Sequence, residues 1–259
     1  MEIVTAYNTD IGNIKKLNQD SLSVKVVNTP LERIAFAIVC DGMGGLERGE
    51  LASKELIFAF NKWFATAFVQ MVADNSFSVK KLNAQWMMLV NKLNKQLGNY
   101  ASQKGIMMGT TLSVLLIYKD SFFICHVGDS CIYKIDHSIK KLTIDHTLAA
   151  EEVRRGIITE EEALADPRRN ILMQCVGASK IVKPQFESGD ITGAMTFLLS
   201  SDGFIHNISE QEIFENFCPE NMKDRVQMTR VCEEITKLVI ERGEKDNVTV
   251  VVLTLRNEE

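Results

Sequence analysis

The sequence predicts an α+β fold in which two antiparallel β-sheets are covered by helices. Segments with strand character are grouped along the chain, and segments with helical periodicity lie together between those groups. Strand and helix do not alternate regularly, as they would in a parallel sheet built from βαβ units. The glycines that follow Asp41 do not take the G-x-G-x-x-G spacing of a dinucleotide-binding fold, and the chain has no Walker A lysine.

Two strands are expected near the start of the chain. Residues 20–27, DSLSVKVV, alternate between apolar and polar side chains, which indicates a half-exposed strand at a sheet edge. Residues 33–40, RIAFAIVC, are almost wholly apolar, which predicts a strand buried on both faces. This second strand leads directly into Asp41.

Two long amphipathic helices are expected next. From Gly49, apolar residues recur every three or four positions as far as Met71. The same spacing runs from Leu82 to Leu97. The chain therefore returns from the second strand into a pair of helices.

Three short β-rich runs follow, and they predict an antiparallel meander. They are GTTLSVLLIY at 109–118, FFICHVGDS at 122–130 and CIYKID at 131–136. From 145 to about 170 the charge rises and the apolar content falls. We expect this segment to be a mobile, flap-like excursion with one or two helical turns.

The rest of the chain returns mainly to strand. ILMQCVGA, IVKPQFES and MTFLLSSDG predict strands at 171–178, 181–188 and 195–203. A third amphipathic helix is expected at 223–242, and NVTVVVLTL predicts a closing buried strand at 247–255.

Composition indicates one globular domain over residues 1–259. The chain is 46% hydrophobic and 24% charged, and it has only four prolines and no linker-like stretch. The net charge of -5 argues against nucleic acid and anionic membrane, because both attract clustered Lys and Arg. The sequence shows neither a secretory leader nor a continuous run of roughly 18 apolar residues. We therefore expect a cytoplasmic protein.

The cysteines indicate buried, reduced thiols. No two of them form a CxxC pair, which argues against a zinc site or a redox dithiol. None is part of the His-Cys, five residues, Arg pattern, so a cysteine-nucleophile phosphatase is excluded. The six cysteines are Cys40, Cys125, Cys131, Cys175, Cys218 and Cys232.

Five aspartates border apolar runs and stand beside small or turn-forming residues. Taken singly, an Asp-Gly pair is most often a hairpin turn. FAIVCDG and FLLSSDG, however, bring carboxylates out of strands that must be deeply buried, where an unpaired charge is costly. The five are Asp20, Asp41, Asp129, Asp202 and Asp246.

A divalent cation would relieve that cost. Mg²⁺ and Mn²⁺ favour carboxylate, carbonyl and water oxygens. The glycines after Asp41, which are Gly42, Gly44 and Gly45, would let a backbone carbonyl approach the same ion. A zinc or di-iron site rich in histidine is not expected from four histidines in unrelated contexts. His126 is expected in the core, and His146 in local hydrogen bonding.

The order of motifs resembles the metal-dependent serine/threonine protein phosphatases of type 2C, the PPM family, in the short form found in bacteria. The similar segments lie in register over nearly the whole chain. That family folds as a four-layer α-β-β-α sandwich with paired helices on both outer faces. The segments are GNIKKLNQDS, VCDGMGGLERGELAS, GTTLSVLLI, HVGDSCIYKI, LTIDHTLA, RRNILMQCVGA, LLSSDGFIHNIS and KDNVTVVVL.

The resemblance implies roles for the aspartates. Asp41 would bridge two metal ions, and the carbonyl of Gly42 would bind the second. Asp202 and Asp246 would hold the first. Asp129, with Asp202, would support a third ion. Asp20 would be an outer-shell acid that orients metal-bound water.

Three positions depart from patterns known in the family. Gln19 stands where many relatives have a glutamate that serves the second metal, and it is a weaker oxygen donor. Lys15 stands where the phosphate-binding arginine is expected; it can neutralise phosphate but lacks the bidentate fork. Met43 replaces the histidine general acid of animal members. Arg168 and Arg169 are expected near the site, either in ion pairs or in contact with substrate.

The implied function is hydrolysis of phosphoserine and phosphothreonine in proteins by a metal-activated bridging water, with no phosphoenzyme. The implied cofactors are two Mn²⁺ or Mg²⁺ ions, with a third in some members. The expected partners are phosphoprotein substrates of a serine/threonine kinase, and the protein is expected to be a monomer. The alternative is a pseudophosphatase that binds phosphoproteins without efficient turnover, which Gln19 and Lys15 favour. A phosphatase of small metabolites is a third reading.

Overall fold

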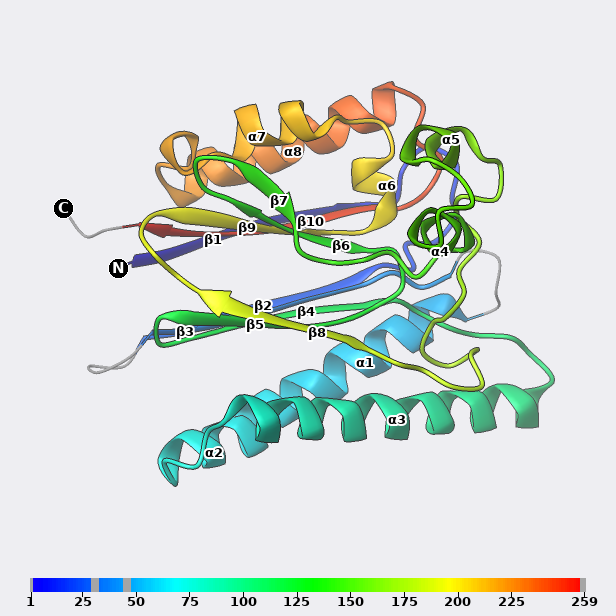
Figure 1. Cartoon of the computed structure of the whole chain (residues 1–259), viewed down its shortest axis with the longest axis horizontal. Helices are drawn as coiled ribbons and strands as arrows, with labels where there is room; N and C mark the ends of the chain where they lie inside the picture. The colour runs from blue at the N-terminus through cyan, green and yellow to red at the C-terminus, as the bar shows by residue number, and fades with distance from the viewer. Residues whose placement is uncertain (1, 29–32, 44–47, 257–259) are drawn as a thin grey trace.

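A computed structural model of the chain describes residues 2–28, 33–43 and 48–256. In this part of the chain, two antiparallel sheets of five strands each stack face to face, and helices cover both outer faces (Figure 1). The expected four-layer α-β-β-α sandwich is confirmed.

The two sheets have the strand orders β1-β10-β9-β6-β7 and β2-β3-β4-β5-β8. The first sheet consists of β1 (Glu2–Asp10), β10 (Val248–Arg256), β9 (Met195–Ser200), β6 (Cys131–Ile135) and β7 (Ile139–Lys141). The second consists of β2 (Ser21–Asn28), β3 (Arg33–Cys40), β4 (Leu112–Tyr118), β5 (Ser121–Val127) and β8 (Gln185–Asp190).

A pair of helices covers each sheet, and smaller helices gather at one end of the sandwich (Figure 1). α7 (Glu210–Phe217) and α8 (Arg225–Glu241) cover the first sheet; η2 (Pro219–Asn221) is a 3₁₀ turn between them. α1 (Gly49–Trp63) and α3 (Val79–Lys104) cover the second, and α1 continues through the π-helical turn η1 (Phe64–Phe68) into α2 (Val69–Ala73). α4 (Leu148–Arg154), α5 (Glu160–Ala165) and α6 (Asp202–Ile205) lie at the end where β3 and β9 terminate.

β3 is buried on both faces, as its apolar sequence predicts. Phe36 belongs to the cluster between the second sheet and its helices, while Ala37 belongs to the cluster between the two sheets. A third cluster lies between the first sheet and α8 and includes Phe217 and Cys232. The strand ends that carry the aspartates are therefore held from above and below by packed side chains.

The expected meander is wrong at its third strand. β4 and β5 pair as an antiparallel hairpin, but β6 pairs with β9 and β7 in the other sheet. The chain changes sheet at Gly128, which has φ 111°, a conformation open to glycine. A Cβ at this position would lie 2.6 Å from the Thr111 side chain, so the crossing also requires the small residue.

The strand expected at 171–178 is also wrong. This segment makes only two isolated bridges, Thr147 with Leu172 and Thr110 with Val176. Its buried residues, such as Cys175 and Val176, anchor the end of the excursion instead of forming a ladder. The excursion contains two short helices, α4 and α5, in agreement with the expected helical turns. The strand expected at 181–188 begins only at Gln185.

Several elements were not expected from the sequence; β7, α6 and η2 are very short, and β1 and α7 are the longer ones. β1 is an edge strand in which only Ala6 is fully buried, so its sequence lacks a clear apolar alternation. α7 is short and begins with a capping box between Ser209 and Glu212, which is a local signal and not a periodic one.

Residues Gly49–Ala73 form the one helix in the described chain whose length and composition would suffice to cross a membrane. This alone is weak support for a span, because core helices meet the same criterion. The side chains of Leu56, Phe60 and Phe68 pack into the core beneath β3. The absence of a membrane partner stays a prediction.

Replacing Phe36 by alanine should lower the free energy of unfolding by about 3–5 kcal/mol, because the ring is fully buried and leaves a cavity. Its ring stacks on Phe64 at 4.6 Å between centroids. The measurement is urea unfolding. Phe58→Ala, on the exposed face of α1 with 68% of the residue exposed, is the matched control and should change stability by less than about 0.5 kcal/mol. Equal losses in the two variants would contradict the core assignment.

Candidate metal centre

The register of the strands brings the five predicted aspartates to one end of the sandwich. In the second sheet, Ser21 pairs with Cys40, so the residues just outside them, Asp20 and Asp41, share an edge. In the first sheet, Ser200 pairs with both Val250 and Cys131. The ends of β9, β10 and β6 therefore meet, and Asp202, Asp246 and Asp129 lie just beyond them.

Asp41 is electrostatically coupled to all the other members of the group. Burial raises the pKa of its carboxyl well above the usual range, and the neighbouring carboxylates raise it further. Those neighbours are Asp20, Asp202, Asp129 and Asp246. The Asp41 backbone is fixed by two bonds to Thr111, the residue before β4: the Asp41 N–H donates to Thr111 Oγ1 at 2.8 Å, and the Asp41 carbonyl accepts from the Thr111 N–H at 2.9 Å.

Asp20 is the most deeply buried of the five aspartates, with 8% of the residue exposed. Neither of its carboxylate oxygens has a hydrogen-bond partner within 3.5 Å. Burial raises its pKa to about 7, although the nearby hydroxyls of Thr249 and Ser201 lower it in part. An unpaired buried carboxylate is costly unless it is protonated or meets a cation.

Asp129 and Asp202 lie on the other sheet and repel each other. Burial raises the pKa of Asp129 to about 8, and the charges of Asp202 and Asp145 contribute. Burial also raises the pKa of Asp202, with a further contribution from Asp246. Asp202 Oδ1 is buried without a hydrogen-bond partner.

His206 and Glu244 support the Asp202 side of the site, and sequence reasoning missed both. His206 Nε2 lies 3.5 Å from Asp202 Oδ2, and His206 Nδ1 lies 3.3 Å from Glu244 Oε2. Burial alone would lower the pKa of His206, but the hydrogen bond to Glu244 and the charge of Asp202 raise it. Glu244 Oε1 also accepts the backbone N–H of Asp246 at 2.9 Å. The sequences around them, HN at 206–207 and EKD at 244–246, show no hydrophobic periodicity or motif that would have pointed to a role at the site.

Asn247 fixes the loop that carries Lys15 and Gln19. Its Oδ1 accepts the N–H of Gln19 at 2.9 Å, and its Nδ2 donates to the carbonyls of Ile11 and Leu17. Lys15 is thereby held at the site, where Nζ lies 2.7 Å from Asp246 Oδ1. The predicted phosphate-binding lysine thus contacts one of the predicted metal ligands.

Gly42 and Gly49 allow two backbone segments to touch. A Cβ on Gly42 would lie 2.4 Å from the Gly49 carbonyl oxygen and 2.6 Å from that of Gln19. The Gly42 N–H donates to the Gln19 carbonyl at 3.2 Å. Asp41-Gly42 is therefore not a hairpin turn; the chain leaves β3 and passes close to the start of α1. Gly44 and Gly45 lie outside the described residues.

The remaining predicted residues have structural roles. His126 is fully buried, and His146 accepts the Gly128 N–H at 3.0 Å, as expected. The Met43 sulfur packs near Gly109. Arg168 pairs with Glu152 and Asp166 on the surface, which supports the ion-pair reading. All six cysteines are free thiols, and all but Cys218 are buried.

The donor chemistry of the site fits a hard divalent cation. The buried unpartnered oxygens of Asp20 and Asp202, and the mutual repulsion around Asp41, are the features that a cation would relieve. In residues 2–28, 33–43 and 48–256, no three His, Cys, Asp or Glu side chains converge closely enough to hold one ion in the conformation shown.

Comparison with known proteins assigns the family. A sequence model of the protein phosphatase 2C family matches residues 14–239. Protein phosphatase PhpP of Streptococcus pneumoniae is 30% identical over 252 residues, which cover 97% of both chains. The chain belongs to the protein phosphatase 2C family. It is a metal-dependent serine/threonine protein phosphatase whose substrates are phosphoproteins.

Solved structures of phosphatases agree with this assignment. The phosphatase superposes on Stp1 from Staphylococcus aureus with a TM-score of 0.82 at 26% identity, covering 99% of this chain and 96% of that one. The catalytic domain of PstP in complex with two manganese ions gives a TM-score of 0.75 at 25% identity, covering 98% and 99%. That complex supports the metal dependence of the phosphatase.

The stability of this phosphatase without divalent cations should fall as pH rises from about 4 to about 8. The folded pKa values of Asp20 and Asp129, about 7 and about 8, lie above the unfolded value, so the folded state binds more protons in this range. The measurement is the melting temperature in EDTA across that range. Asp20→Asn should reduce the fall, whereas Asp190→Asn, at an exposed position of β8, should leave it unchanged. A melting temperature that rises with pH in EDTA would contradict the assigned repulsion.

Proposed function

We propose that this phosphatase hydrolyses phosphoserine and phosphothreonine with two divalent cations, Mn²⁺ or Mg²⁺, held by the aspartate group. The observation that carries the proposal is the coupling of Asp41 to four other carboxylates from both sheets. A group of this kind can ionise fully only next to a compensating positive charge.

The positions of the aspartates support separate roles. Asp41 is central, since all the others raise its pKa, which suits a bridging ligand. Asp202 and Asp246 lie together on the first sheet and would hold the first ion. The Gly42 carbonyl, on the side of Gln19, would serve the second. Gln19 offers a neutral oxygen, so this second site would bind its ion more weakly than one with a carboxylate.

Asp129 and Asp202 would hold a third ion, and the charge of Asp202 contributes to the raised pKa of Asp129. Asp20, whose pKa is raised to about 7, would act in the outer shell and orient water at the ions. When bound, the cations supply Lewis acidity that makes water a stronger acid and offsets the charge of the phosphoryl group.

Direct attack by water, with no phosphoenzyme, agrees with the state of the nearest thiol. Cys40 immediately precedes Asp41 and is fully buried. Burial raises its pKa well above the usual value, and the charges of Asp20 and Asp41 raise it further. Cys40 therefore stays a neutral thiol and is not a nucleophile.

Lys15 would bind the substrate phosphate. Its ammonium group lies at the site and is half-buried, so it can move from Asp246 to a phosphoryl oxygen when a cation takes that carboxylate. We further propose that the protein is a cytoplasmic monomer that reverses the action of a serine/threonine kinase and binds neither membrane nor nucleic acid. The net charge of -5 supports the last point.

Asp41→Asn and Asp202→Asn should each lower the Mn²⁺-dependent hydrolysis of p-nitrophenyl phosphate by roughly 100-fold or more, because each removes a charged metal ligand. Circular dichroism should show an unchanged fold. Asp190→Asn is the matched control and should retain full activity. Metal-independent turnover that survives in both site variants would overturn the proposed mechanism.

The same preparation separates the phosphatase from a pseudophosphatase. Calorimetric titration of the wild-type protein with Mn²⁺ should show at least two bound ions. A protein with no turnover and fewer than two bound ions would support the pseudophosphatase, which Gln19 and Lys15 favour.

Lys15→Met should weaken inhibition by inorganic phosphate by roughly tenfold, because one charge-assisted hydrogen bond is lost. Mn²⁺ affinity should not decrease, since Asp246 loses a competing partner. Lys16→Met, at the exposed neighbouring position, is the matched control. If phosphate inhibition is the same in the two variants, Lys15 does not bind the substrate phosphate.

A further inference from the structure

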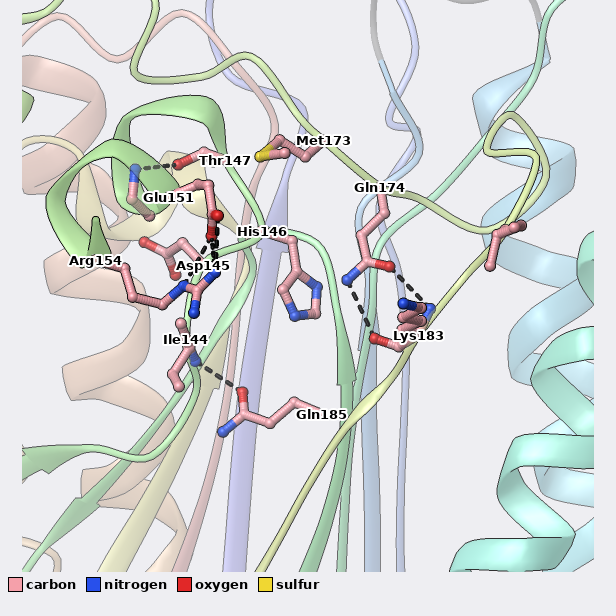
Figure 2. Close-up of a pocket in the computed structure, with 12 residues that line it drawn as sticks. Ile144, Asp145, His146, Thr147, Glu151, Arg154, Met173, Gln174, Lys183 and Gln185 are labelled. Carbon is pink, nitrogen blue, oxygen red and sulfur yellow. Dashed lines mark hydrogen bonds and ion pairs between the residues drawn. The ribbon is translucent and has the colours of Figure 1, made fainter. Parts of the chain in front are cut away.

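A pocket of about 530 Å³ lies beside the metal centre, between the flap and the edge of the second sheet. Its two walls come from distant parts of the chain. One wall is residues 144–154, which include α4, and the other is residues 173–185, which lead into β8. Figure 2 shows His146 between Glu151 and Arg154 on one side and Gln174 and Lys183 on the other.

Two glutamine side chains fix the walls without filling the space between them. The Gln174 amide bonds both backbone groups of Lys183: Oε1 accepts its N–H at 2.9 Å, and Nε2 donates to its carbonyl at 3.1 Å (Figure 2). Gln185 does the same across the other gap, where Oε1 accepts the Ile144 N–H at 2.8 Å and Nε2 donates to the Leu142 carbonyl at 3.0 Å. Each side-chain amide therefore bonds one backbone N–H and one backbone carbonyl, as a neighbouring strand would. The pocket is therefore largely preformed.

Three large apolar side chains line this pocket and remain exposed to solvent. The exposed fractions are 58% for Ile144, 53% for Met173 and 67% for Ile181. Single exposed apolar residues are common, but three around one preformed hollow mark a binding site for apolar groups.

Both acidic residues that line the pocket are paired with cations, unlike those of the metal centre, and Lys183 lines it as well. Asp145 pairs with Lys141 at 2.7 Å, and Arg154 pairs with Glu151 at 2.6 Å. Burial lowers the pKa of His146, which favours the neutral ring. The paired acids offer little to a cation, and the three exposed apolar side chains suit an apolar group.

The pocket is joined to the rim of the metal centre through His146. The His146 N–H donates to the Gly128 carbonyl at 2.8 Å, and the Gly128 N–H donates to His146 Nδ1 at 3.0 Å. Gly128 directly precedes Asp129. A peptide whose phosphate reached the aspartates would cross this rim on the way to the pocket, advancing about 3.3–3.6 Å with each extended residue.

We infer that this pocket receives an apolar side chain of the phosphoprotein substrate, a short distance along the chain from the phosphorylated residue. This inference rests on the proposed function, and it assigns the phosphatase a sequence preference in addition to recognition of phosphate. Ile144, Met173 and Ile181 would contact the apolar group, and His146 would form the floor.

The test uses phosphopeptides in which a single leucine is moved one position at a time through an alanine and serine sequence around phosphothreonine. In the wild-type enzyme, leucine at one position should raise kcat/KM roughly tenfold, mainly through KM. Ile181→Ser should remove this preference, and Ile181→Leu should retain it. Hydrolysis of p-nitrophenyl phosphate, which has no side chain to dock, should be the same in all three proteins.

Val226→Ser is the matched control, because Val226 is an 80% exposed apolar residue on α8, outside the pocket. It should leave the leucine preference intact. The inference is overturned if the wild-type enzyme shows no leucine preference or if Ile181→Ser keeps it. An equal loss of p-nitrophenyl phosphate hydrolysis in Ile181→Ser would also overturn it, since the residue would then act on the site itself.

Failure of the proposed function would give a different result. If the wild-type protein hydrolyses neither p-nitrophenyl phosphate nor any phosphopeptide in Mn²⁺, the function fails whatever the pocket binds. Fluorescence anisotropy of the same labelled peptides then tests the pocket directly. A leucine preference in Kd that Ile181→Ser abolishes would support the subsite, and equal Kd values throughout the series would exclude it.

Discussion

The repulsion among buried carboxylates is the constraint on which this structure depends. Asp41 and its four acidic neighbours come from both sheets, and each raises the pKa of Asp41. Separate surface loops would let such charges move apart. Here the strand ends are held between packed layers, with Phe36 on one face of β3 and Ala37 on the other, so the acids cannot relax by separating. The fold keeps them together, and a cation or a proton must compensate.

The support around the acids follows from the same constraint. Glu244, His206 and Asn247 hold the loops beyond the strands by hydrogen bonds, and Lys15 places a positive charge against Asp246. Together they hold a site of like charges in one arrangement, because hydrogen bonds to the surrounding backbone offset the repulsion among the carboxylates.

The strands that are buried on both faces could be predicted from the sequence, because a continuous apolar run indicates burial directly. The sequence also placed the five aspartates, since each stands where such a run ends. The sequence could not show that the chain changes sheet at Gly128. That change depends on the backbone conformation of Gly128, with φ 111°, which the hydrophobic pattern does not report. His206 and Glu244 were missed for a related reason: their roles come from contacts between segments far apart, with 38 positions separating them. The Lys15 contact with Asp246 was likewise invisible until the loop was placed by Asn247.

The pairing of β1 with β10 has a topological consequence. Glu2 lies opposite Arg256, so the first and last strands end side by side, at the end of the sandwich away from α4, α5 and α6 (Figure 1). A short peptide could join these two strands without crossing the aspartates, and the backbone could then be opened in an exposed connection elsewhere. The catalytic end would keep its geometry in such a circular permutant, because it depends on which strands are neighbours and not on the order in which the ribosome makes them.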